Sequence, residues 1–363
     1  MLSLIVNNTS MFNFFKQKGK LGIDIGTASI KVVELQKKAN RFALNNYGIL
    51  ELKDIKTGTG TAIGQSVLKM PDDEIVWGIK EIIRMAKMES RDVVASLPSS
   101  STFTTVIDMP YISEQDLNRV LPFEAKKYIP IPLDEVVLSW TIIDFENKGA
   151  LTNAEIFLAA VPRTETDRYR KIMKGAGLNL VALELENLAL IRALLGNDLS
   201  PAAIVNIGGR STSIIIADKG FERVGHNYEI GGFEITKSIA RSLNISLERA
   251  EELKKKIGLG RSDENIINEA MISLVDMMVF ETKKTIANYE VGGKKISRVL
   301  LVGGLTNMPN FLNYFKDKLG RDTFMGDTLA RVVYPENLKP ITKEISSTFA
   351  VSIGLGMREI RGR

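Results

Sequence analysis

A short polar segment near the amino terminus carries residues that could bind phosphate. Asp24 ends a predicted strand, Gly26 follows two positions later, and Lys31 opens the return strand. The bend consists of Thr27, Ala28 and Ser29. Such a hairpin offers backbone N–H groups and hydroxyls to phosphate oxygens, a carboxylate to the waters of a metal ion, and one cation. These residues indicate a nucleoside triphosphate site with Mg²⁺; an ordinary hairpin with a glycine turn is the alternative.

A second segment repeats this arrangement. Asn206 ends another predicted strand, Gly208 and Gly209 follow, and Thr212 starts the return strand. Two such hairpins at matching places can clamp one phosphate chain from both sides. Neither is a Walker loop, because the chain contains no G-x-x-x-x-G-K-[ST] sequence.

A third glycine turn follows the predicted strand over 299–302. Gly303 and Gly304 leave bare backbone there, which a base or ribose could approach. A tight strand-to-helix turn is the alternative reading of the same two residues.

The elements expected around the two hairpins follow the same order, three strands, helical segments and a further strand. The first half has strands over 22–25, 30–35, 41–52 and 93–97 and a helix over 72–88. The second half has strands over 203–207, 212–218, 221–228 and 299–302, helices over 233–243 and 247–257, two helical stretches leading to Tyr289, and helices over 310–319 and 348–359. This repetition predicts an internal duplication, with two facing lobes and a cleft between them.

A segment of different pattern separates the halves. It predicts a small inserted α+β module over 98–163, with strands over 103–109, 136–145 and 155–161 and a helix over 114–128. Helices over 165–175 and 186–195 and a strand over 180–185 then return the chain to the first lobe.

Composition narrows the functional classes. The 363 residues suffice for more than one domain, and 44% hydrophobic and 25% charged residues are typical of a globular protein. The chain has no Cys, which fits a reducing cytoplasm, and its single His226 argues against histidine-based metal or triad chemistry. The net charge of +5 is scattered, so no nucleic-acid partner is expected. No apolar run approaches the roughly 20 residues that span a bilayer, and no signal peptide is expected.

Residues 11–20 combine three Phe with three Lys. This segment could touch a membrane surface or a partner. The alternative is a frayed terminus whose aromatic rings rest on the first lobe. Met11 is also a possible start of the chain.

Further segments complete a recognisable pattern. They are residues 186–190, 350–358, 108–110, 123–135, 231–240 and 250–254. With the hairpins, they make residues 12–360 resemble the actin/Hsp70/FtsA ATPase superfamily and, most closely, the PilM family of type IV pilus assembly proteins. The resemblance implies an actin-like, duplicated RNase H-like α/β fold, with two lobes around a nucleotide cleft and an inserted FtsA-like 1C subdomain. The implied division is a segment over 1–20, subdomain 1A over 21–97 and 164–201, 1C over 98–163, 2A over 202–220 and 299–363, and 2B over 221–298.

The resemblance also implies residue roles. Asp24 would order the waters of Mg²⁺, and Glu186 would orient the attacking water. The residues expected at phosphate oxygens are Gly26, Thr27, Ala28, Ser29, Lys31, Gly208, Gly209 and Thr212. The residues expected around ribose and adenine are Gly232, Glu251, Lys254, Gly303 and Gly304. For Glu251 and Lys254 a solvated helical pair is the alternative, and for Glu186 it is a charge that complements a helix dipole.

Three positions depart from the family pattern. Asn206, the second candidate catalytic residue, stands where the second phosphate loop normally begins with Asp; its amide can still hydrogen-bond a metal-bound water but supplies no negative charge. Leu305 replaces a usual small residue, and Asn187 replaces a common Pro. We therefore expect ATP (or ADP) and Mg²⁺ to bind, with slow or absent hydrolysis, so that the chain is at most a slow Mg-dependent ATPase.

The resemblance further implies a partner and a place. A PilN-like bitopic membrane protein would bind through its N-terminal cytoplasmic peptide, in a groove between the first domain and the insert. Other components of the pilus machine, a ring of copies, and a position at the cytoplasmic face of the inner membrane are also implied. An FtsA-like membrane-tethered division protein is the runner-up, although such proteins end in a linker and an amphipathic helix, whereas this sequence ends at Arg363. A sugar kinase would need an additional Asp in the cleft, and none is identified.

Overall fold

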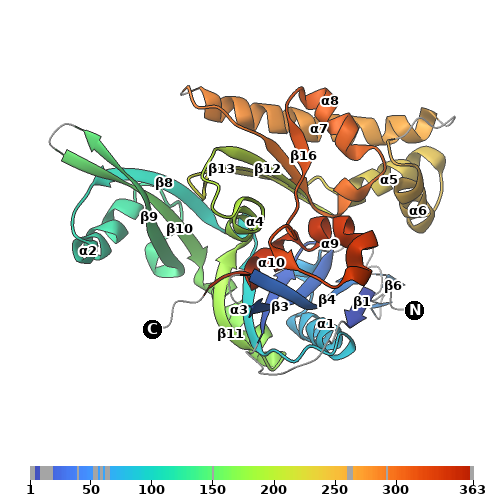
Figure 1. Cartoon of the computed structure of the whole chain (residues 1–363), viewed down its shortest axis with the longest axis horizontal. Helices are drawn as coiled ribbons and strands as arrows, with labels where there is room; N and C mark the ends of the chain where they lie inside the picture. The colour runs from blue at the N-terminus through green and yellow to red at the C-terminus, as the bar shows by residue number, and fades with distance from the viewer. Residues whose placement is uncertain are drawn as a thin grey trace.

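The computed structural model describes residues 5–8, 19–38, 41–51, 56–57, 60–61, 66–148, 151–259, 265–291 and 293–359. The aromatic and basic positions 11–18 lie outside these residues. The described chain forms two lobes with a smaller module beside them (Figure 1). No helix within the described ranges has the length and apolar character needed to cross a membrane.

The sheet of the first lobe combines antiparallel and parallel pairing. Its strands are β1 (Ile5–Asn8), β2 (Lys20–Ile25), β3 (Ser29–Lys38), β4 (Arg41–Glu51), β7 (Asp92–Leu97), β11 (Asn179–Leu185) and β17 (Val332–Val333). They lie in the order β1-β4-β3-β2-β7-β11, with β17 beside β4. The pairs from β1 to β2 are antiparallel, whereas β2-β7 and β7-β11 are parallel. The short pair β5 (Lys56–Thr57) and β6 (Gly60–Thr61) is separate.

The sheet of the second lobe repeats this topology. Its strands are β12 (Ala202–Ile207), β13 (Thr212–Asp218), β14 (Phe221–Tyr228), β15 (Val299–Val302) and β16 (Thr323–Met325). The order β14-β13-β12-β15-β16, antiparallel up to β12 and parallel beyond it, corresponds to β4-β3-β2-β7-β11. The predicted duplication and the actin-like fold class are therefore confirmed.

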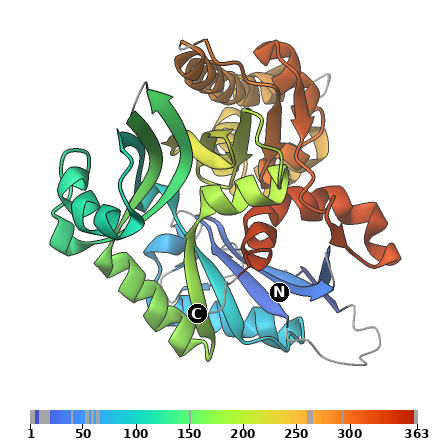
Figure 2. The same ribbon diagram turned by 60° about the vertical axis from the view of Figure 1, so that its left-hand side comes forward.

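Helices cover both faces of the first sheet. They are α1 (Asp72–Met85) and α3 (Arg163–Gly175) on the outer face, and α4 (Glu186–Leu195) and α10 (Ala350–Gly356) on the other. Ile75, Ile79 and Ile82 recur at helical spacing in α1 and are buried in the core with Ile172 and Met173 of α3. Figure 2 shows α1 and α3 along the lower side of the molecule.

The remaining helices belong to the second lobe, the module and the C-terminal part. They are α5 (Gly232–Leu243), α6 (Leu247–Ile257), α7 (Asn265–Glu290), α8 (Phe311–Leu319), α9 (Thr342–Thr348), and α2 (Glu114–Ala125) in the module. The module also holds the antiparallel sheet β8-β10-β9, formed by β8 (Phe103–Pro110), β9 (Val136–Lys148) and β10 (Leu151–Pro162). These elements lie within the range 98–163 expected for an insert.

Several element predictions need correction. The helix expected over 348–359 is the shorter α10, which starts only at Ala350, because the backbone leaves helical geometry at Phe349, where φ is −100° and ψ is 18°. The helix α9, just before it, was not predicted. One long helix, α7, replaces the two stretches expected before Tyr289. The strands β16 and β17 were not predicted. β17 pairs with the first sheet, although its residues lie in the range 299–363 expected in the second lobe.

Candidate functional site

The two predicted phosphate hairpins are built alike. The Gly26 N–H donates to the Ser29 carbonyl at 3.0 Å. The Gly208 N–H donates to the Ser211 carbonyl at 2.9 Å. Each turn joins the first two strands of its sheet, so the duplication places both hairpins at equivalent points of the two lobes.

The tips of the two hairpins touch across the lobes. A Cβ added to Gly209 would lie 2.4 Å from the Ala28 Cβ, closer than real Cβ atoms approach. Glycine at this position therefore allows the second hairpin to lie against the first. The Gly209 carbonyl also accepts the Phe233 N–H at 2.7 Å, and the Gly208 carbonyl accepts the Gly232 N–H at 3.0 Å, which fixes the start of α5 on this hairpin.

The first hairpin holds a buried ion pair. The Asp24 carboxylate is 5% exposed, lies 3.4 Å from Lys31 Nζ, and accepts the Ser96 hydroxyl at 3.0 Å. A Cβ on Gly26 would lie 3.8 Å from both Lys31 Nζ and Asp24 Oδ2, so the turn runs directly over the pair. Thr27 and Ser29 flank it in the same turn.

A second carboxylate lies close to this pair. Glu186 starts α4, and its Oε1 accepts the Ser99 N–H at 3.0 Å. Burial, together with the negative charge of Asp24, raises the pKa of Glu186. Burial and the same two carboxylates also raise the pKa of Tyr169, whose hydroxyl has no hydrogen-bond partner among the described residues. The structure thus brings Asp24 and Glu186 together beneath the first hairpin.

The second hairpin has no equivalent ion pair; its charged residue, Arg210, stacks over the Phe233 ring at 4.0 Å from the ring centroid. Asp24 pairs in register with Lys31, whereas Asn206 pairs with Ser213. The Asn206 side chain is half-buried and has no hydrogen-bond partner among the described residues. The ion pair of the first lobe is therefore replaced by an amide and a hydroxyl in the second.

Thr212 lies differently from its expected role at phosphate. Its side chain is buried, and its hydroxyl donates to the Ile230 carbonyl at 2.7 Å. The hydroxyl thereby fixes the segment before α5. The pattern of small residues did not reveal this, because Thr212 is already the first residue of β13 and points into the lobe.

Lys254 and Glu251 are not a solvated pair. Lys254 is 7% exposed, and its Nζ donates to the Gly232 carbonyl at 3.0 Å, the Thr236 hydroxyl at 2.9 Å and Glu251 Oε2 at 2.6 Å. Burial lowers the pKa of Lys254, and Glu251 opposes that change. All three donors of the ammonium are taken, so Lys254 positions the first turn of α5.

The two residues of the third glycine turn differ: Gly303 has a positive φ, and Gly304 has open space around it. Gly303 has φ of +99°, and a Cβ there would lie 2.2 Å from the Ile207 carbonyl oxygen, so glycine is required. A Cβ on Gly304 would meet nothing within 4 Å. Leu305, the residue expected to be small, is buried in the core of the second lobe. Gly304 therefore presents open backbone next to the second hairpin.

Two functional contacts were missed by the sequence analysis. Ser96 fixes the Asp24 carboxylate from the neighbouring strand, and only the parallel pairing of β2 with β7 brings them together. Glu222 is buried and accepts Asn187 Nδ2 at 2.9 Å and the Thr104 hydroxyl at 3.2 Å. The position at which a Pro was expected, Asn187, thus joins α4 to the second lobe.

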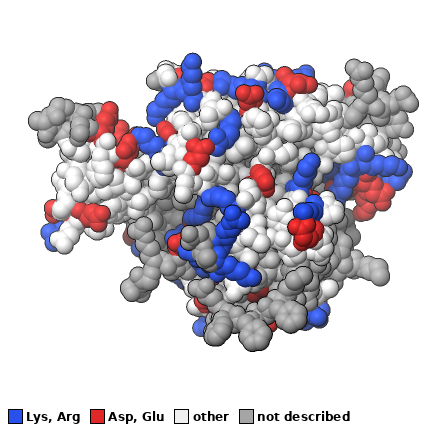
Figure 3. Space-filling view, in the orientation of Figure 1, with Lys and Arg blue, Asp and Glu red and all other residues white. Residues whose placement is uncertain are grey.

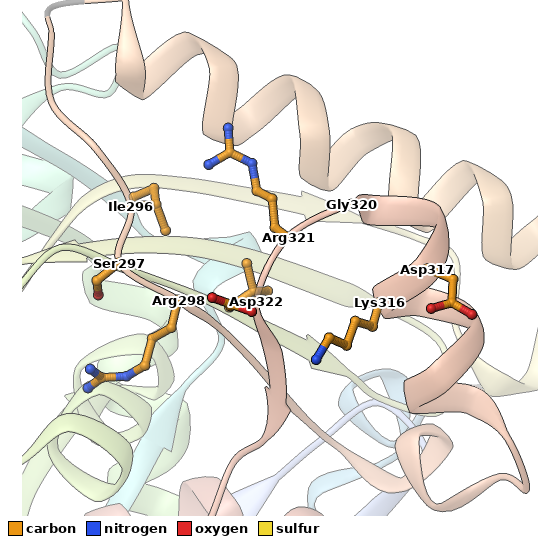
Figure 4. A pocket seen from close by; sticks show the side chains of 9 residues that line it. Ile296, Ser297, Arg298, Lys316, Asp317, Gly320, Arg321 and Asp322 are labelled. Carbon is orange, nitrogen blue, oxygen red and sulfur yellow. The ribbon is translucent and has the colours of Figure 1, made fainter.

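Other features of the surface do not form a comparable site. A depression of about 570 Å³ between α8 and the starts of β15 and β16 is lined by Arg298, Lys316 and Arg321 (Figure 4). Arg298 is paired with Asp198 and Arg321 with Glu290, so these two cations are already neutralised. In the described part of the chain, no three or more His, Cys, Asp or Glu side chains form a metal-binding group.

Comparison with known proteins identifies the family. A sequence profile described as "Type IV pilus assembly protein PilM" matches residues 22–360. The cell division protein FtsA of Enterococcus faecalis (strain ATCC 700802 / V583) is 25% identical over 339 residues, which cover 81% of this chain and 75% of that protein. FtsA of Bacillus subtilis (strain 168) is 22% identical over 316 residues, 80% of this chain and 71% of that protein.

Solved structures show the same fold. A chain of the "PilM-PilN type IV pilus biogenesis complex" superimposes with a TM-score of 0.78 and 23% identity, over 93% of this chain and 98% of that chain. MreB5 of Spiroplasma citri bound to AMPPNP superimposes with a TM-score of 0.55 and 14% identity, over 93% of this chain and 95% of that chain. Because the family profile spans nearly the whole sequence, the chain belongs to the PilM family of type IV pilus assembly proteins.

Proposed function

We propose that this protein binds Mg-ATP or Mg-ADP between its two lobes. The observation that carries the proposal is the pair of matched hairpins that meet at Ala28 and Gly209. The buried Asp24 carboxylate fits the waters of Mg²⁺, Lys31 and both turns fit phosphate oxygens, and open backbone at Gly304 fits the base or ribose. Mg²⁺ would neutralise phosphate charge when bound.

We propose further that hydrolysis is slow or absent. Glu186, whose pKa is raised by burial and by the charge of Asp24, is the residue that would orient the attacking water. The second lobe, however, offers Asn206 and Ser213 where the first offers an ion pair. Since phosphoryl transfer depends on positioning and charge, a second hairpin with Asn206 in place of a carboxylate favours holding the nucleotide over hydrolysing it.

The proposed role is a nucleotide-dependent scaffold in type IV pilus assembly at the inner face of the inner membrane. The similar solved structure is a complex with PilN. By analogy, the N-terminal cytoplasmic peptide of a PilN-like bitopic membrane protein would bind between the first lobe and the module of β8, β9 and β10. Other pilus components and further copies of the chain, arranged as a ring, are proposed neighbours.

Nucleotide binding can be tested with Asp24→Asn, which keeps the size of the side chain but removes its charge. Purified protein is denatured and the released nucleotide identified, and Mg-ATP is titrated calorimetrically. We expect wild-type binding and at least a roughly tenfold loss in the variant, since one charge-assisted contact is worth about 1.5–3 kcal/mol. Asp73→Asn, at the exposed start of α1, is the matched control. Absence of both released nucleotide and Mg-ATP binding in the wild type would overturn the proposal.

Partner binding is a separate measurement. The N-terminal peptide of a PilN-like protein and a scrambled peptide of the same composition are titrated into the whole chain, with and without Mg-ATP. Binding of the native peptide alone supports the pilus role. Equal binding of both peptides, or of neither, argues against it.

FtsA-like membrane-tethered assembly remains the second candidate, because FtsA proteins match most of the chain at up to 25% identity. ATP-dependent filaments on lipid, seen by electron microscopy, would favour this role. Discrete particles that bind the PilN-like peptide would favour the pilus role.

A further inference from the structure

The outer face of the first lobe carries lysines without acidic partners. Lys80 and Lys87 lie on and just after α1, and Lys171 and Lys174 lie on α3 beside it. All four side chains are exposed, and none has an ion-pair partner among the described residues. We call these four residues the α1/α3 lysines.

Most acidic side chains of the two helices lie in their first turns, at the opposite ends from Lys87 and Lys174: they are Asp72, Asp73, Glu74 and Glu165. Nearer the lysines, Glu81 is paired with Arg84 and Asp167 with Arg170, each within its own helix, and Glu89 lies near Lys80 and Lys87. Cations in a last helical turn also complement the helix dipole. That effect accounts for Lys174, in the last turn of α3, but not for Lys80 or Lys171, which lie earlier in their helices. The C-terminal half of this face therefore carries more basic than acidic side chains.

An exposed tryptophan lies on the same face. Trp77, Lys80 and Arg84 occupy positions i, i+3 and i+7 of α1, which place them on one stripe of the helix. Trp77 is 46% exposed, and Met85, at the end of the same helix, is 40% exposed. An amphipathic indole next to long basic side chains is the combination found at membrane–water interfaces.

A depression lies between the C-terminal ends of the two helices. It has a volume of about 530 Å³ and joins basic side chains, Lys80, Lys87 and Arg91, to the apolar side chains of Met88 and Leu178. Long lysine stems over apolar surface suit a ligand with an anionic head and an apolar body.

This face is remote from the nucleotide residues. Arg91 precedes the first residue of β7, whereas Ser96, which contacts Asp24, lies near the end of that strand.

We propose that the outer face of α1 and α3 docks on an anionic phospholipid bilayer. A broad face of two parallel helices with unpaired lysines complements a surface of negative charge, and each basic residue near such a surface adds to the attraction. The exposed Trp77 indole can enter the headgroup layer of a bilayer. It therefore favours a lipid surface over an acidic protein as the partner of this face. The proposal does not depend on nucleotide binding.

Vesicle sedimentation tests the proposal with the full chain. Vesicles of phosphatidylcholine containing phosphatidylglycerol are compared with pure phosphatidylcholine at physiological salt. We expect binding to the anionic vesicles only, and a loss of roughly tenfold or more in the combined variant Lys80→Glu, Lys87→Glu and Lys174→Glu. The matched control, Lys256→Glu, Lys283→Glu and Lys343→Glu, changes the net charge equally at exposed residues elsewhere.

A fluorescence measurement keeps the test independent of charge. The chain contains two tryptophans, and Trp140→Phe leaves Trp77 as the reporter. We expect a blue shift of Trp77 emission when anionic vesicles are added and none with pure phosphatidylcholine. Equal loss of binding in both charge variants, or no blue shift, would overturn the proposal, as would wild-type binding to soluble polyanions but not to vesicles. Unchanged Mg-ATP affinity in the charge variants would show that a loss of vesicle binding comes from the altered face and not from damage to the nucleotide site.

Discussion

Gly304 offers a test of nucleotide binding that leaves the protein undisturbed. A Cβ at this position meets no atom within 4 Å, so Gly304→Ala should leave the melting temperature nearly unchanged. If the base or ribose lies against this backbone, the added methyl should weaken Mg-ATP binding roughly tenfold. Calorimetric titration and thermal unfolding of the same sample separate the two effects. Full ATP affinity in the folded variant would remove Gly304 from the site.

Glu222 should make the stability depend on pH. Burial raises the pKa of Glu222 above the ordinary 4.5. From that value upward, the folded state retains a proton that the unfolded state has lost, so this residue lowers stability as pH rises. Glu222→Gln removes the penalty, and the unpartnered Asn187 Oδ1 can accept the new amide after a flip of the Asn187 side chain. We expect the variant to gain stability relative to wild type between acidic and neutral pH in urea unfolding.

The control for this prediction is Glu248→Gln, an exposed residue at the start of α6. Its difference from wild type should be small and nearly constant over the same pH range. A Glu222→Gln difference that does not grow with pH would show that the residue titrates normally in the folded protein.

At the scale of elements, the edge strand β14 ties the module to the second lobe. Arg223, whose side chain is 6% exposed, lies 2.9 Å from Glu155 of β10. Phe221 packs on Phe157 with ring centroids 5.8 Å apart. On the surface beside them, Lys219 pairs with Asp144 of β9. Lys219 also lies 3.8 Å from Glu155. The module is thus held by the buried Arg223–Glu155 pair and by the exposed pairs of Lys219.

The Arg223–Glu155 and Lys219–Asp144 pairs should differ in their contribution to stability. Glu155→Gln removes the nearer charged partner of the buried Arg223, which keeps only Asp218 at 3.8 Å, and should cost about 1.5–3 kcal/mol in urea unfolding. Asp144→Asn, its matched control on the neighbouring strand, should change little, because the pair with Lys219 is exposed and screened. Equal effects of the two substitutions would contradict this assignment.

Glycine residues allow α10 to pack closely against α4 and β2. A Cβ on Gly354 would lie 2.0 Å from the Ala189 carbonyl oxygen, and a Cβ on Gly22 would lie 2.0 Å from the Ser352 carbonyl oxygen. Glycine at these two positions lets α10 lie directly against α4 and β2. The hairpin strand β2 is therefore braced from the side opposite α1.

At the scale of the whole molecule, a nucleotide held by both hairpins should stabilise both lobes together. A ligand at a hundredfold excess over its Kd adds about 2.7 kcal/mol of stability. We expect Mg-ATP to raise the melting temperature by a few degrees in the wild type and by much less in Asp24→Asn. Hydrogen exchange should slow at both Gly26 and Gly208. Slowing confined to one hairpin would contradict a two-sided site.

Charge across the molecule is mixed, in agreement with the scattered basic residues of the sequence. In Figure 3, Lys and Arg gather near the middle of the view and elsewhere alternate with Asp and Glu. Only the folded structure shows which lysines lack ion-pair partners, and that four of these, the α1/α3 lysines, share one face.

The sequence by itself determined the duplicated order of strands, the two hairpins and the positions of their glycines. These features are local, because alternation of apolar residues and a glycine turn act within a few residues. What the tertiary structure decided is which atoms meet. It brought Ser96 to Asp24, joined the Thr212 hydroxyl to the Ile230 carbonyl, and filled all donors of Lys254. Such contacts join residues far apart in the chain, and only the packing of the lobes fixes their distances.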